Sequence, residues 1–460
     1  MNQELFSTLN LHPDIIRNVA TLGYQSMTPI QALTLPSIVE GKDVIGQAKT
    51  GSGKTAAFGL GVLHSLNVKF FRVQSLIICP TRELADQVAK EVRKLGRTIH
   101  NIKVLTLCGG VPMGPQVGSL EHGAHIVVGT PGRIEDHLRR GTLNLEHVNT
   151  LVLDEADRML DMGFQSAIDM IIEQVPSQRQ TLLFSATFPR QIQHIAQRIM
   201  KQPIMAKVEE GHDSRTIEQY FYQIDHVDYR FTALQLLLLE HRSISTVVFC
   251  NTKRDTQEVA DQLVDCGFSA LALHGDLEQK DRDRTLVRFA NKSISILVAT
   301  DVAARGLDID SLDAVMNYHI ARDPEIHVHR IGRTGRAGSK GLACSLFAEK
   351  EHYKISQLEK YLNLTVESQP LPATTLLGQY TYKPPMETIQ IDGGKKQKVR
   401  AGDILGALTG DKGIAGTQVG KIDLFENHSY VAVHRGVADA ALAKLTEGRL
   451  KGRSFKVRLL

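Results

Sequence analysis

The sequence lacks the cysteine pattern of a disulfide-linked or zinc-binding protein. Its 460 residues include five cysteines, an odd number, and no two of them form a C-x-x-C pair. It also lacks an apolar run of the ~20 residues that a membrane-spanning helix needs. The first residues, MNQELFSTLN, have neither the basic nor the apolar segment of a secretion signal. These absences predict a cytoplasmic protein with buried free thiols and no membrane partner.

The distribution of apolar residues predicts tandem α/β domains. Over residues 1–208, short apolar runs such as SLIICP, IVVGT and TLVLDEAD alternate with helix-compatible segments, and a second such series occupies 217–362. Continuous apolar strands interleaved with amphipathic helices are typical of a parallel sheet covered on both faces. Two such domains are expected to face each other across a cleft, where α/β sheets bind ligands.

Two segments are predicted to connect these domains. The charged stretch 209–216, EEGHDSRT, separates the two α/β series. The second connector, 363–385, contains prolines at positions 370, 372, 384 and 385, and these predict an extended linker that is not packed.

The C-terminal segment, 386–460, differs from the rest of the chain in pattern and in charge. Its strands and helices follow the order βαββαβ, which predicts a small α+β domain. It carries 13 Lys and Arg against 8 Asp and Glu, whereas the preceding 385 residues carry 41 against 42. A basic domain on a neutral body suggests a polyanionic partner, most simply nucleic acid, although a solvated basic surface gives the same count.

The octamer AKTGSGKT has the pattern of a phosphate-binding loop, because an apolar run precedes it and a helix-compatible run follows. Backbone N–H groups of such a turn converge on a phosphate, and the following helix adds its dipole. Lys54 is placed to reach the β- and γ-phosphates, and Thr55 offers a hydroxyl to Mg²⁺. The predicted nucleotide contacts are Ala48, Lys49, Thr50, Gly51, Ser52, Gly53, Lys54 and Thr55.

The tetrapeptide DEAD, Asp154 to Asp157, follows the apolar run TLVL. A carboxylate at the end of a strand beside a phosphate loop is where a nucleoside triphosphatase holds Mg²⁺, so Asp154 is the predicted metal ligand. Glu155 is placed to polarise a water for attack on the γ-phosphate. A nucleoside triphosphate and Mg²⁺ are therefore the predicted substrate and cofactor.

Residues 1 to about 362 resemble the DEAD-box RNA helicases through an ordered set of motifs. The set begins with GYQSMTPIQ, which is similar to the Q motif, and Phe6 lies upstream of it. The motifs that follow are AKTGSGKT, PTRELADQ, Gly109-Gly110, TPGR, DEAD, SAT, VVFCNT, QKDR, ATDVAARGLD and HRIGRTGR. The resemblance implies two tandem RecA-like domains and an ATP-dependent RNA helicase.

The resemblance also implies roles around ATP. Gln31 would read adenine through its amide, and Phe6 and Tyr24 would lie against the ring. Arg333 and Arg336 would act as arginine fingers; they lie on neighbouring positions if their segment is helical. Asp308 would contact the ribose.

Further motif residues are expected to grip the RNA backbone without reading bases, because glycines, small hydroxyls and arginines suit phosphates and sugars. Ser185 and Thr187 would couple ATP turnover to strand separation. The predicted RNA contacts of the body are Thr81, Arg82, Gly109, Gly110, Thr130, Arg133, Gln279, Arg282 and Thr300.

The C-terminal segment resembles an RRM-like module whose aromatic signature is mostly missing, with ENHSYVAV at the usual aromatic positions. Stacking on its sheet is predicted to be limited to Tyr430 and His428. Together with the helicase body, the stretch IDGGKKQKVRAGDILGALTG is similar to the bacterial DbpA subfamily, which implies binding to a 23S rRNA hairpin and action on large ribosomal subunit precursors. The predicted RNA contacts of this segment are Lys395, Lys396, Lys398, Arg400 and Tyr430.

The sequence therefore predicts a helicase of ribosome assembly, with two alternatives left open. One is an ATP-gated RNA clamp or scaffold that does not unwind productively. Intact Glu155, Arg333 and Arg336 argue against it. The other is a DNA helicase, which the combination of Q motif, DEAD and SAT disfavours.

Overall fold

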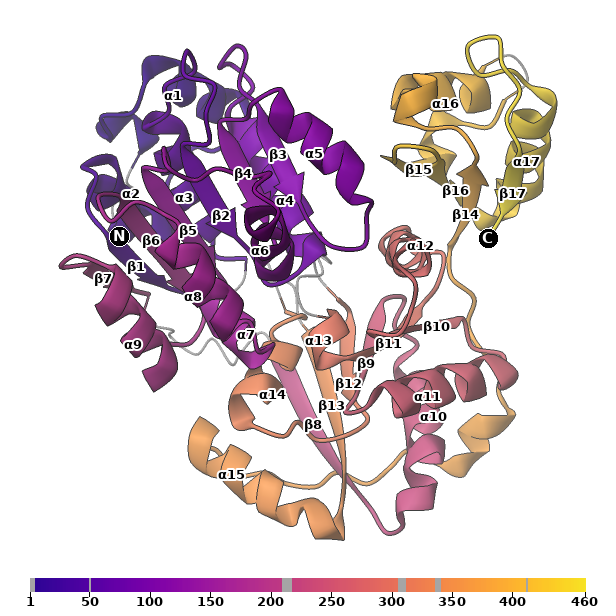
Figure 1. Ribbon diagram of the computed structural model, residues 1–460. Helices are drawn as coiled ribbons and strands as arrows, with labels where there is room; N and C mark the ends of the chain where they lie inside the picture. Colours follow the sequence, from indigo (N-terminus) through magenta and orange to yellow (C-terminus); the bar gives the residue numbers. More distant parts are fainter. Residues whose placement is uncertain (1–4, 49–50, 209–216, 305–311, 336–340, 411–412) are drawn as a thin grey trace. The chain divides into compact units, whose positions relative to one another are not determined.

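The computed structural model describes residues 5–48, 51–208, 217–304, 312–335, 341–410 and 413–460. The chain divides into two units, 1–211 and 212–460 (Figure 1). The predicted linker 209–216 lies outside the described residues. Within the described part of the chain, no helix is long and apolar enough to span a membrane. All five cysteines are free; four are buried, but Cys266 is exposed, contrary to the prediction for that thiol.

The first unit is built on a seven-stranded sheet in which every pair is parallel and the strand order is β3-β4-β2-β5-β6-β1-β7. The strands are β1 (Val44–Gln47), β2 (Ser75–Ile78), β3 (Val104–Leu107), β4 (Ile126–Gly129), β5 (Thr150–Asp154), β6 (Gln180–Ser185) and β7 (Ile204–Lys207). The helices are α1 (Pro13–Thr21), α2 (Pro29–Val39), α3 (Lys54–His64), α4 (Arg82–Leu95), α5 (Met113–Glu121), α6 (Pro131–Arg139), α7 (Ala156–Asp161), α8 (Gln165–Glu173) and α9 (Arg190–Ile199).

Both faces of this sheet are buried, which explains why its strands are continuous apolar runs. One apolar core includes Leu35, Phe58 and Val88 and joins the sheet to α1–α4. The other includes Ile134 and Ile168 and joins the sheet to α6, α8 and α9. With both faces covered, the carboxyl ends of the strands are the edge that remains for function.

The second unit contains a six-stranded parallel sheet in the order β10-β11-β9-β12-β13-β8. Its strands are β8 (Ile217–Ile224), β9 (Thr246–Cys250), β10 (Ala270–Leu273), β11 (Ile296–Thr300), β12 (Ala314–Asn317) and β13 (Gly341–Ala348). Its helices are α10 (Arg230–His241), α11 (Lys253–Asp265), α12 (Gln279–Ala290), α13 (Asp301–Ala304), α14 (Pro324–Ile331) and α15 (His352–Leu362). We call this part the second domain. Apolar cores again lie on both faces, so the predicted pair of RecA-like parallel-sheet domains is confirmed.

The connector 363–385 runs along the second domain and packs against it, so the prediction of an unpacked linker is wrong. The amide of Gln369 donates to the carbonyl of Phe221 (2.7 Å), and Thr381 Oγ1 donates to the carbonyl of Gly267 (2.7 Å). Leu371, Leu376 and Tyr382 pack against the core of the second domain. The apolar residues between the prolines provide this attachment, and the segment, which is described throughout, forms no regular element beyond the short 3₁₀ helix Thr374–Gly378.

The tail domain, residues 386–460, has the predicted βαββαβ order and a four-stranded antiparallel sheet, β15-β16-β14-β17. Its elements are β14 (Met386–Ile391), α16 (Ala401–Thr409), β15 (Val419–Leu424), β16 (Ser429–His434), α17 (Ala438–Glu447) and β17 (Val457–Leu459). One face of the sheet, which includes Ile389 and Val431, packs with α16 and α17 to form a small core.

Candidate active site and nucleic-acid interface

The phosphate loop connects the end of β1 to the start of α3, as the sequence predicted. Gly51 and Gly53 have φ values of +83° and +95°, a region that L residues rarely adopt, so the turn requires glycine at both positions. Lys54 begins α3, is buried, and donates from Nζ to the carbonyl of Ala48 (2.5 Å). Burial lowers the pKa of Lys54, and the neighbouring Asp154 and Glu155 oppose that shift. Lys49 and Thr50 lie outside the described residues.

The DEAD motif begins at the last residue of β5, two strands from β1 in the sheet. Asp154 is 2% exposed, and its Oδ1 has no hydrogen-bond partner among the described residues. Burial and the adjacent Glu155 raise the pKa of Asp154 to about 7, and Lys54 opposes the rise. A buried carboxylate oxygen without a donor fits an Mg²⁺ ligand. Since Mg²⁺ is usually held by one or two carboxylates together with phosphates and water, Asp154 and Thr55 are sufficient as protein ligands.

Glu155 is held by an arginine that the sequence analysis did not single out. Its backbone is left-handed (φ 52°), and its carboxylate forms a buried ion pair with the Arg158 guanidinium. The sequence spacing could have indicated this pair, because Arg158 directly follows DEAD and lies three positions after Glu155 at the start of α7.

The SAT motif is joined to DEAD by three hydrogen bonds. Thr187 donates to Asp157 Oδ2 from its backbone N (2.9 Å) and from Oγ1 (2.8 Å), and the amide of Asp157 donates to Ser185 Oγ (3.3 Å). Burial acts to raise the pKa of Asp157, but the bonds from Thr187 outweigh it and leave that pKa below its ordinary value. The hydroxyls of Ser185 and Thr187 therefore stabilise the Asp157 carboxylate. They do not cap the next helix, α9, whose N-cap residue is Pro189.

The Q-motif glutamine is attached to the phosphate loop. Gln31 lies in the first turn of α2; its Oε1 accepts from the amide of Thr28 (2.9 Å), and its Nε2 donates to the carbonyl of Gly53 (3.1 Å). If Gln31 bound adenine, its side-chain amide would replace these two hydrogen bonds with bonds to the base. Phe6 is buried, and its ring lies 6.3 Å from that of Tyr24, whose hydroxyl donates to Glu91 (2.8 Å).

The predicted RNA contacts of the first unit lie at the carboxyl ends of three adjacent strands, β3, β4 and β2. Gly109 and Gly110 follow β3, and a Cβ at Gly109 would meet no atom within 4 Å, so the backbone there is approachable. Thr130 follows β4 and precedes α6, and Thr81 follows β2 and caps α4 by accepting from the amide of Leu84 (3.3 Å). Arg82 begins α4, and Arg133 donates from a guanidinium nitrogen to the carbonyl of Val111 (3.1 Å).

These positions divide one sheet edge into two halves. The predicted RNA contacts follow β3, β4 and β2, whereas the phosphate loop follows β1 and the DEAD carboxylates follow β5, with the predicted coupling motif SAT at the end of β6 between them. Because parallel strands end at the same edge, both sets lie on one side of the first unit. The DEAD motif, at the end of β5, borders the RNA half at β2.

In the second domain the predicted contacts also follow strand ends. Thr300 ends β11 and accepts from the amide of Ala303 (3.4 Å), and α12 begins with Gln279 after β10. Gln279 Nε2 donates to Asp283 Oδ1 (2.8 Å), and Arg282 donates to the carbonyl of His274 (3.5 Å).

The arginine-finger segment is not helical at Arg333, so the condition for a helical neighbourhood of Arg333 and Arg336 is not met there. Helix α14 ends at Ile331, and Arg333 follows in a turn, where it is 6% exposed. Asp308 and Arg336 lie outside the described residues. A large, fully buried side chain of α14 is one that the sequence analysis left unassigned, Arg330, whose guanidinium pairs with Asp301 at 2.6 Å and 2.8 Å.

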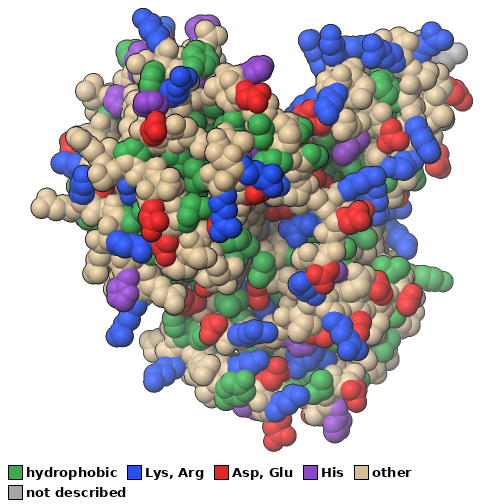
Figure 2. Space-filling view, in the orientation of Figure 1, with side chains coloured by type: hydrophobic (Ala, Val, Ile, Leu, Met, Phe, Trp, Pro, Cys, Tyr) green, Lys and Arg blue, Asp and Glu red, His purple; other side chains and the backbone are tan. Residues whose placement is uncertain are grey.

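The basic residues of the tail domain form an ordered loop. Lys395 and Lys396 lie in a short 3₁₀ turn, their amides donate to the carbonyls of Phe425 and Glu426 (both 2.9 Å), and both side chains are exposed. Lys451, from the second basic segment, donates to the carbonyl of Lys398 (2.9 Å). Figure 2 shows Lys and Arg side chains gathered on the surface of the tail domain. Arg400 is also exposed. The structure thus joins two basic stretches that are far apart in the sequence.

Tyr430 has no exposed surface, which contradicts the prediction that it stacks on an RNA base. Its ring meets Phe425 and His428 edge-on at 5.5 Å and 5.1 Å. The sequence pattern places Tyr430 correctly on the outer face of the sheet, but that face is buried and leaves no room for a base.

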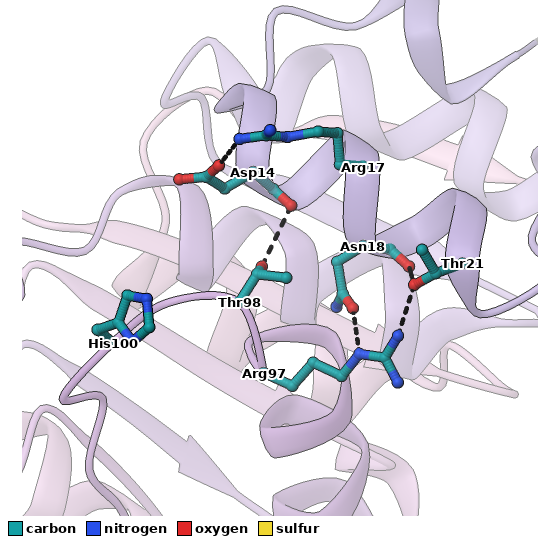
Figure 3. A pocket seen from close by; sticks show the side chains of 7 residues that line it. All are labelled: Asp14, Arg17, Asn18, Thr21, Arg97, Thr98 and His100. Atoms are coloured by element: carbon teal, nitrogen blue, oxygen red, sulfur yellow. Dashed lines mark hydrogen bonds and ion pairs between the residues drawn. The ribbon is translucent and has the colours of Figure 1, made fainter.

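A separate surface depression lies between α1 and the residues that follow α4 (Figure 3). Arg97 donates to Asn18 Oδ1 (2.7 Å) and to Thr21 Oγ1 (2.6 Å), and Thr98 donates to the carbonyl of Asp14 (3.2 Å). Its polar groups hold α1 in place, and none of the residues that line it belongs to the helicase motifs.

Known protein families and relatives match each of the three parts of the chain. Family models described as DEAD/DEAH box helicase, helicase conserved C-terminal domain and DbpA RNA binding domain match residues 28–195, 229–338 and 388–459. The chain is 54% identical over 456 residues to the ATP-dependent RNA helicase DbpA of Escherichia coli, covering 99% of each chain. It is 45% identical over 368 residues to the DEAD-box ATP-dependent RNA helicase CshA of Geobacillus kaustophilus, covering 80% of this chain and 78% of the relative.

Among solved structures, the fold is similar to that of Saccharomyces cerevisiae Dbp5 bound to RNA and ADP BeF3. The TM-score is 0.72 at 30% identity, and the match covers 80% of this chain and 96% of Dbp5. With the motif geometry, the two parallel-sheet domains and the tail domain in place, the chain belongs to the DEAD-box family of ATP-dependent RNA helicases and carries a C-terminal RNA-binding domain of the DbpA type.

Proposed function

We propose that this helicase hydrolyses ATP in response to RNA, opens short RNA duplexes locally, and is directed by its tail domain to a hairpin of 23S rRNA in maturing large ribosomal subunits in the cytoplasm. The division of one sheet edge into an ATP half and an RNA half carries the first part of the proposal. The three hydrogen bonds between SAT and DEAD support it, since they join Asp157, in the same motif as the hydrolytic carboxylates Asp154 and Glu155, to the motif assigned to coupling.

On the ATP half, Lys54 binds the β- and γ-phosphates and the phosphate loop donates backbone N–H groups. Glu155 accepts a proton from the attacking water, and its ion pair with Arg158 orients the carboxylate. Mg²⁺ held by Asp154 and Thr55 would neutralise charge on the phosphates. Arg333 and Arg336 supply the finger charges that a triphosphatase needs in its transition state.

On the RNA half, Thr81, Thr130 and the two glycines contact phosphates and sugars. Each threonine immediately precedes a helix, and the dipole at a helix N-terminus favours a phosphate there. Gln279, Arg282 and Thr300 provide the corresponding contacts in the second domain. Backbone contacts of this kind bind RNA without reading its sequence.

ATP and RNA are each proposed to contact both α/β domains, so each favours closure of the cleft and strengthens binding of the other. Closure brings the arginine fingers to the phosphates and bends the bound strand, and base pairs next to the bend open. Hydrolysis then allows the domains to separate and release the strand.

The tail domain directs the enzyme to its RNA target. Its ordered basic loop with Lys395, Lys396 and Lys398, joined by Lys451, offers a fixed set of phosphate contacts. The chain's 54% identity to E. coli DbpA over its full length supports the assignment of the 23S rRNA hairpin as the target.

ATPase stimulation across a panel of RNAs tests the proposal. We expect a 23S rRNA fragment that contains the hairpin to stimulate hydrolysis at much lower concentration than poly-U of equal length. Equal stimulation by the two RNAs would contradict the proposal that the tail domain directs the enzyme to the hairpin. Stimulation without any duplex opening, measured with a labelled strand beside the hairpin, would favour an ATP-gated clamp instead.

A further inference from the structure

Helix α5 follows the glycine pair, Gly109-Gly110, and is attached to the first unit through a polar side chain. Every residue of α5 is described, and among them only Gln116 is buried, at 7% exposed. The buried residue of a surface helix is ordinarily apolar, because burial of an amide costs free energy unless the amide is hydrogen-bonded. A glutamine at this position therefore requires partners for both ends of its amide.

Both ends of the Gln116 amide are bonded inside the first unit. Its Nε2 donates to the carbonyl of Cys108 (3.0 Å), the residue immediately before the glycine pair. Its Oε1 lies 3.1 Å from Nε2 of His137, in the last turn of α6. His137 has no exposed surface. The amide thus connects α6 to the backbone that leads into the glycine pair.

The ring of His137 is held on its other side by a hydroxyl. Its Nδ1 lies 2.8 Å from Oγ1 of Thr142, a hydroxyl that also lies 3.1 Å from the His137 carbonyl. Burial lowers the pKa of His137, and Arg133 acts in the same direction, so the ring is neutral at neutral pH and carries one N–H. Because Gln116 presents an oxygen to the ring, that N–H belongs on Nε2, and the Thr142 hydroxyl donates to Nδ1.

These contacts form a series of hydrogen bonds that runs in one direction. The Thr142 hydroxyl donates to His137, which donates to Gln116. Gln116 in turn donates to the carbonyl of Cys108. Bonds in such a series polarise one another, and removal of one member leaves a buried partner without its bond. The series therefore acts as a unit on the backbone at Cys108.

A second bond from α6 holds the other side of the glycine pair. Arg133 lies one turn before His137, and its guanidinium donates to the carbonyl of Val111 (3.1 Å). The backbone on each side of the pair is therefore bonded to the same helix. Gly110 has a φ of +73°, and glycine loses more conformational freedom on ordering than any other residue. Holding the flanking carbonyls before RNA arrives reduces the ordering cost of binding.

We propose that His137 and Gln116 are positioning residues that hold the glycine pair in the conformation that accepts the RNA backbone. The inference rests on the proposed function, because it takes the glycine pair as an RNA contact. Both side chains are buried, so neither touches the RNA. They act through the Cys108 carbonyl, and they place the pair beside Thr130, whose amide donates to the carbonyl that ends β3 (3.1 Å).

The test changes one bond at a time in the full-length protein. His137→Leu keeps an apolar side chain in the buried position and removes the link, whereas His137→Gln can still present an N–H to Gln116. Gln116→Glu keeps the oxygen that faces His137 and replaces the donor to Cys108 with a second oxygen. Gln180→Leu is the matched control, since it removes two amide-to-carbonyl bonds at the start of β6, far along the strand from SAT.

Three measurements separate positioning from folding. Hydrogen exchange of residues 108–112, followed by mass spectrometry without RNA, reports how firmly the glycine pair is held. ATPase assays with poly-U give kcat and the RNA concentration for half-maximal stimulation. Nucleotide titration without RNA reports whether the ATP half is intact.

We expect faster exchange over residues 108–112 in His137→Leu and Gln116→Glu, and the parent rate in Gln180→Leu. The two first variants should need about 10-fold more poly-U for half-maximal stimulation, the ratio that corresponds to the loss of one buried hydrogen bond. Their kcat at saturating poly-U and their ATP affinity without RNA should match the parent, because only RNA binding is affected. His137→Gln should recover most of the poly-U response.

A parent-like poly-U requirement in both His137→Leu and Gln116→Glu would overturn the proposal. Loss of ATP affinity in step with the RNA response would also overturn it, because the bonds would then support the unit as a whole. A His137→Gln variant no better than His137→Leu would do the same. Failure of the proposed function is distinct: poly-U would not stimulate the parent enzyme, while hydrogen exchange still reports whether the glycine pair is held.

Discussion

The sheet of the first unit and the sheet of the tail domain use opposite parts of their surfaces. In the first unit both faces are buried in apolar cores, and the predicted contacts lie where strands end. In the tail domain one face is an apolar core and the other is covered by α12, so the exposed lysines lie on the loop after β14. In both cases the predicted contact residues lie on the surface that packing leaves exposed. The comparison shows that a sheet face is available for RNA only if no other part of the chain occupies it.

The largest expected effect is on the first sheet edge. Glu155→Gln should retain ATP binding and reduce RNA-stimulated hydrolysis by about 10²–10⁴-fold, because it removes the general base while keeping the polar contact to Arg158. Single-turnover hydrolysis and nucleotide titration measure the two quantities. Glu146→Gln, on the exposed surface of the same unit, is the control. Hydrolysis near the parent rate would show that another group acts as the base.

A glycine substitution tests the geometry of the tail's basic loop. A Cβ at Gly394 would lie 2.3 Å from the carbonyl oxygen of Phe425 and 2.7 Å from the amide of His428. Since backbone atoms cannot yield as side chains do, Gly394→Ala should destabilise the tail domain by about 1–3 kcal/mol. Urea unfolding measures this, with Gly402→Ala, in open space on α16, as the control. Loss of hairpin preference should accompany the destabilisation, while poly-U stimulation persists.

Substitutions in the tail's basic loop and on the outer face of its sheet are expected to affect RNA binding differently. Lys395→Ala with Lys396→Ala should weaken hairpin binding and reduce the salt slope of that binding by about 0.7–0.9 for each phosphate that is no longer neutralised. Tyr430→Phe should leave hairpin affinity unchanged, because the phenol is buried beside Arg284 of α12. Binding titrations at several salt concentrations measure both the slope and the affinity. Weaker hairpin binding by Tyr430→Phe would restore the sheet face as an RNA surface.

The smallest expected effect concerns the bond between SAT and DEAD. Thr187→Val removes the Oγ1 donor to Asp157 and should cost about 1 kcal/mol of stability at neutral pH, with duplex opening reduced more than ATP hydrolysis. The folded pKa of Asp157 lies below its ordinary value, so this contribution is present above pH ~4 and is lost as the pH falls through the lower, folded pKa. Urea unfolding at pH 7 and pH 3 measures it. A stability difference that does not shrink in acid would mean that the bond does not depend on the ionised carboxylate.

Most strands and the motif positions were predictable because they depend on local pattern. Apolar runs such as LVLD and LLFS became β5 and β6, and glycines at 51 and 53 took the left-handed conformations that the loop requires. The errors have a common cause. The prolines of 363–385 indicated an unpacked linker, and the alternation around Tyr430 indicated an open face. In both cases the deciding factor was a surface formed by residues far away in the sequence.

The sequence by itself determined the two α/β domains, the phosphate loop, the DEAD carboxylates and the basic character of the tail, because strand period, glycine conformation and charge are local properties. Only the tertiary structure decided that Arg158 pairs with Glu155, that Thr187 supports Asp157, and that α12 covers Tyr430. Those relations depend on which elements the parallel sheets bring together, and no local pattern records which side chains meet.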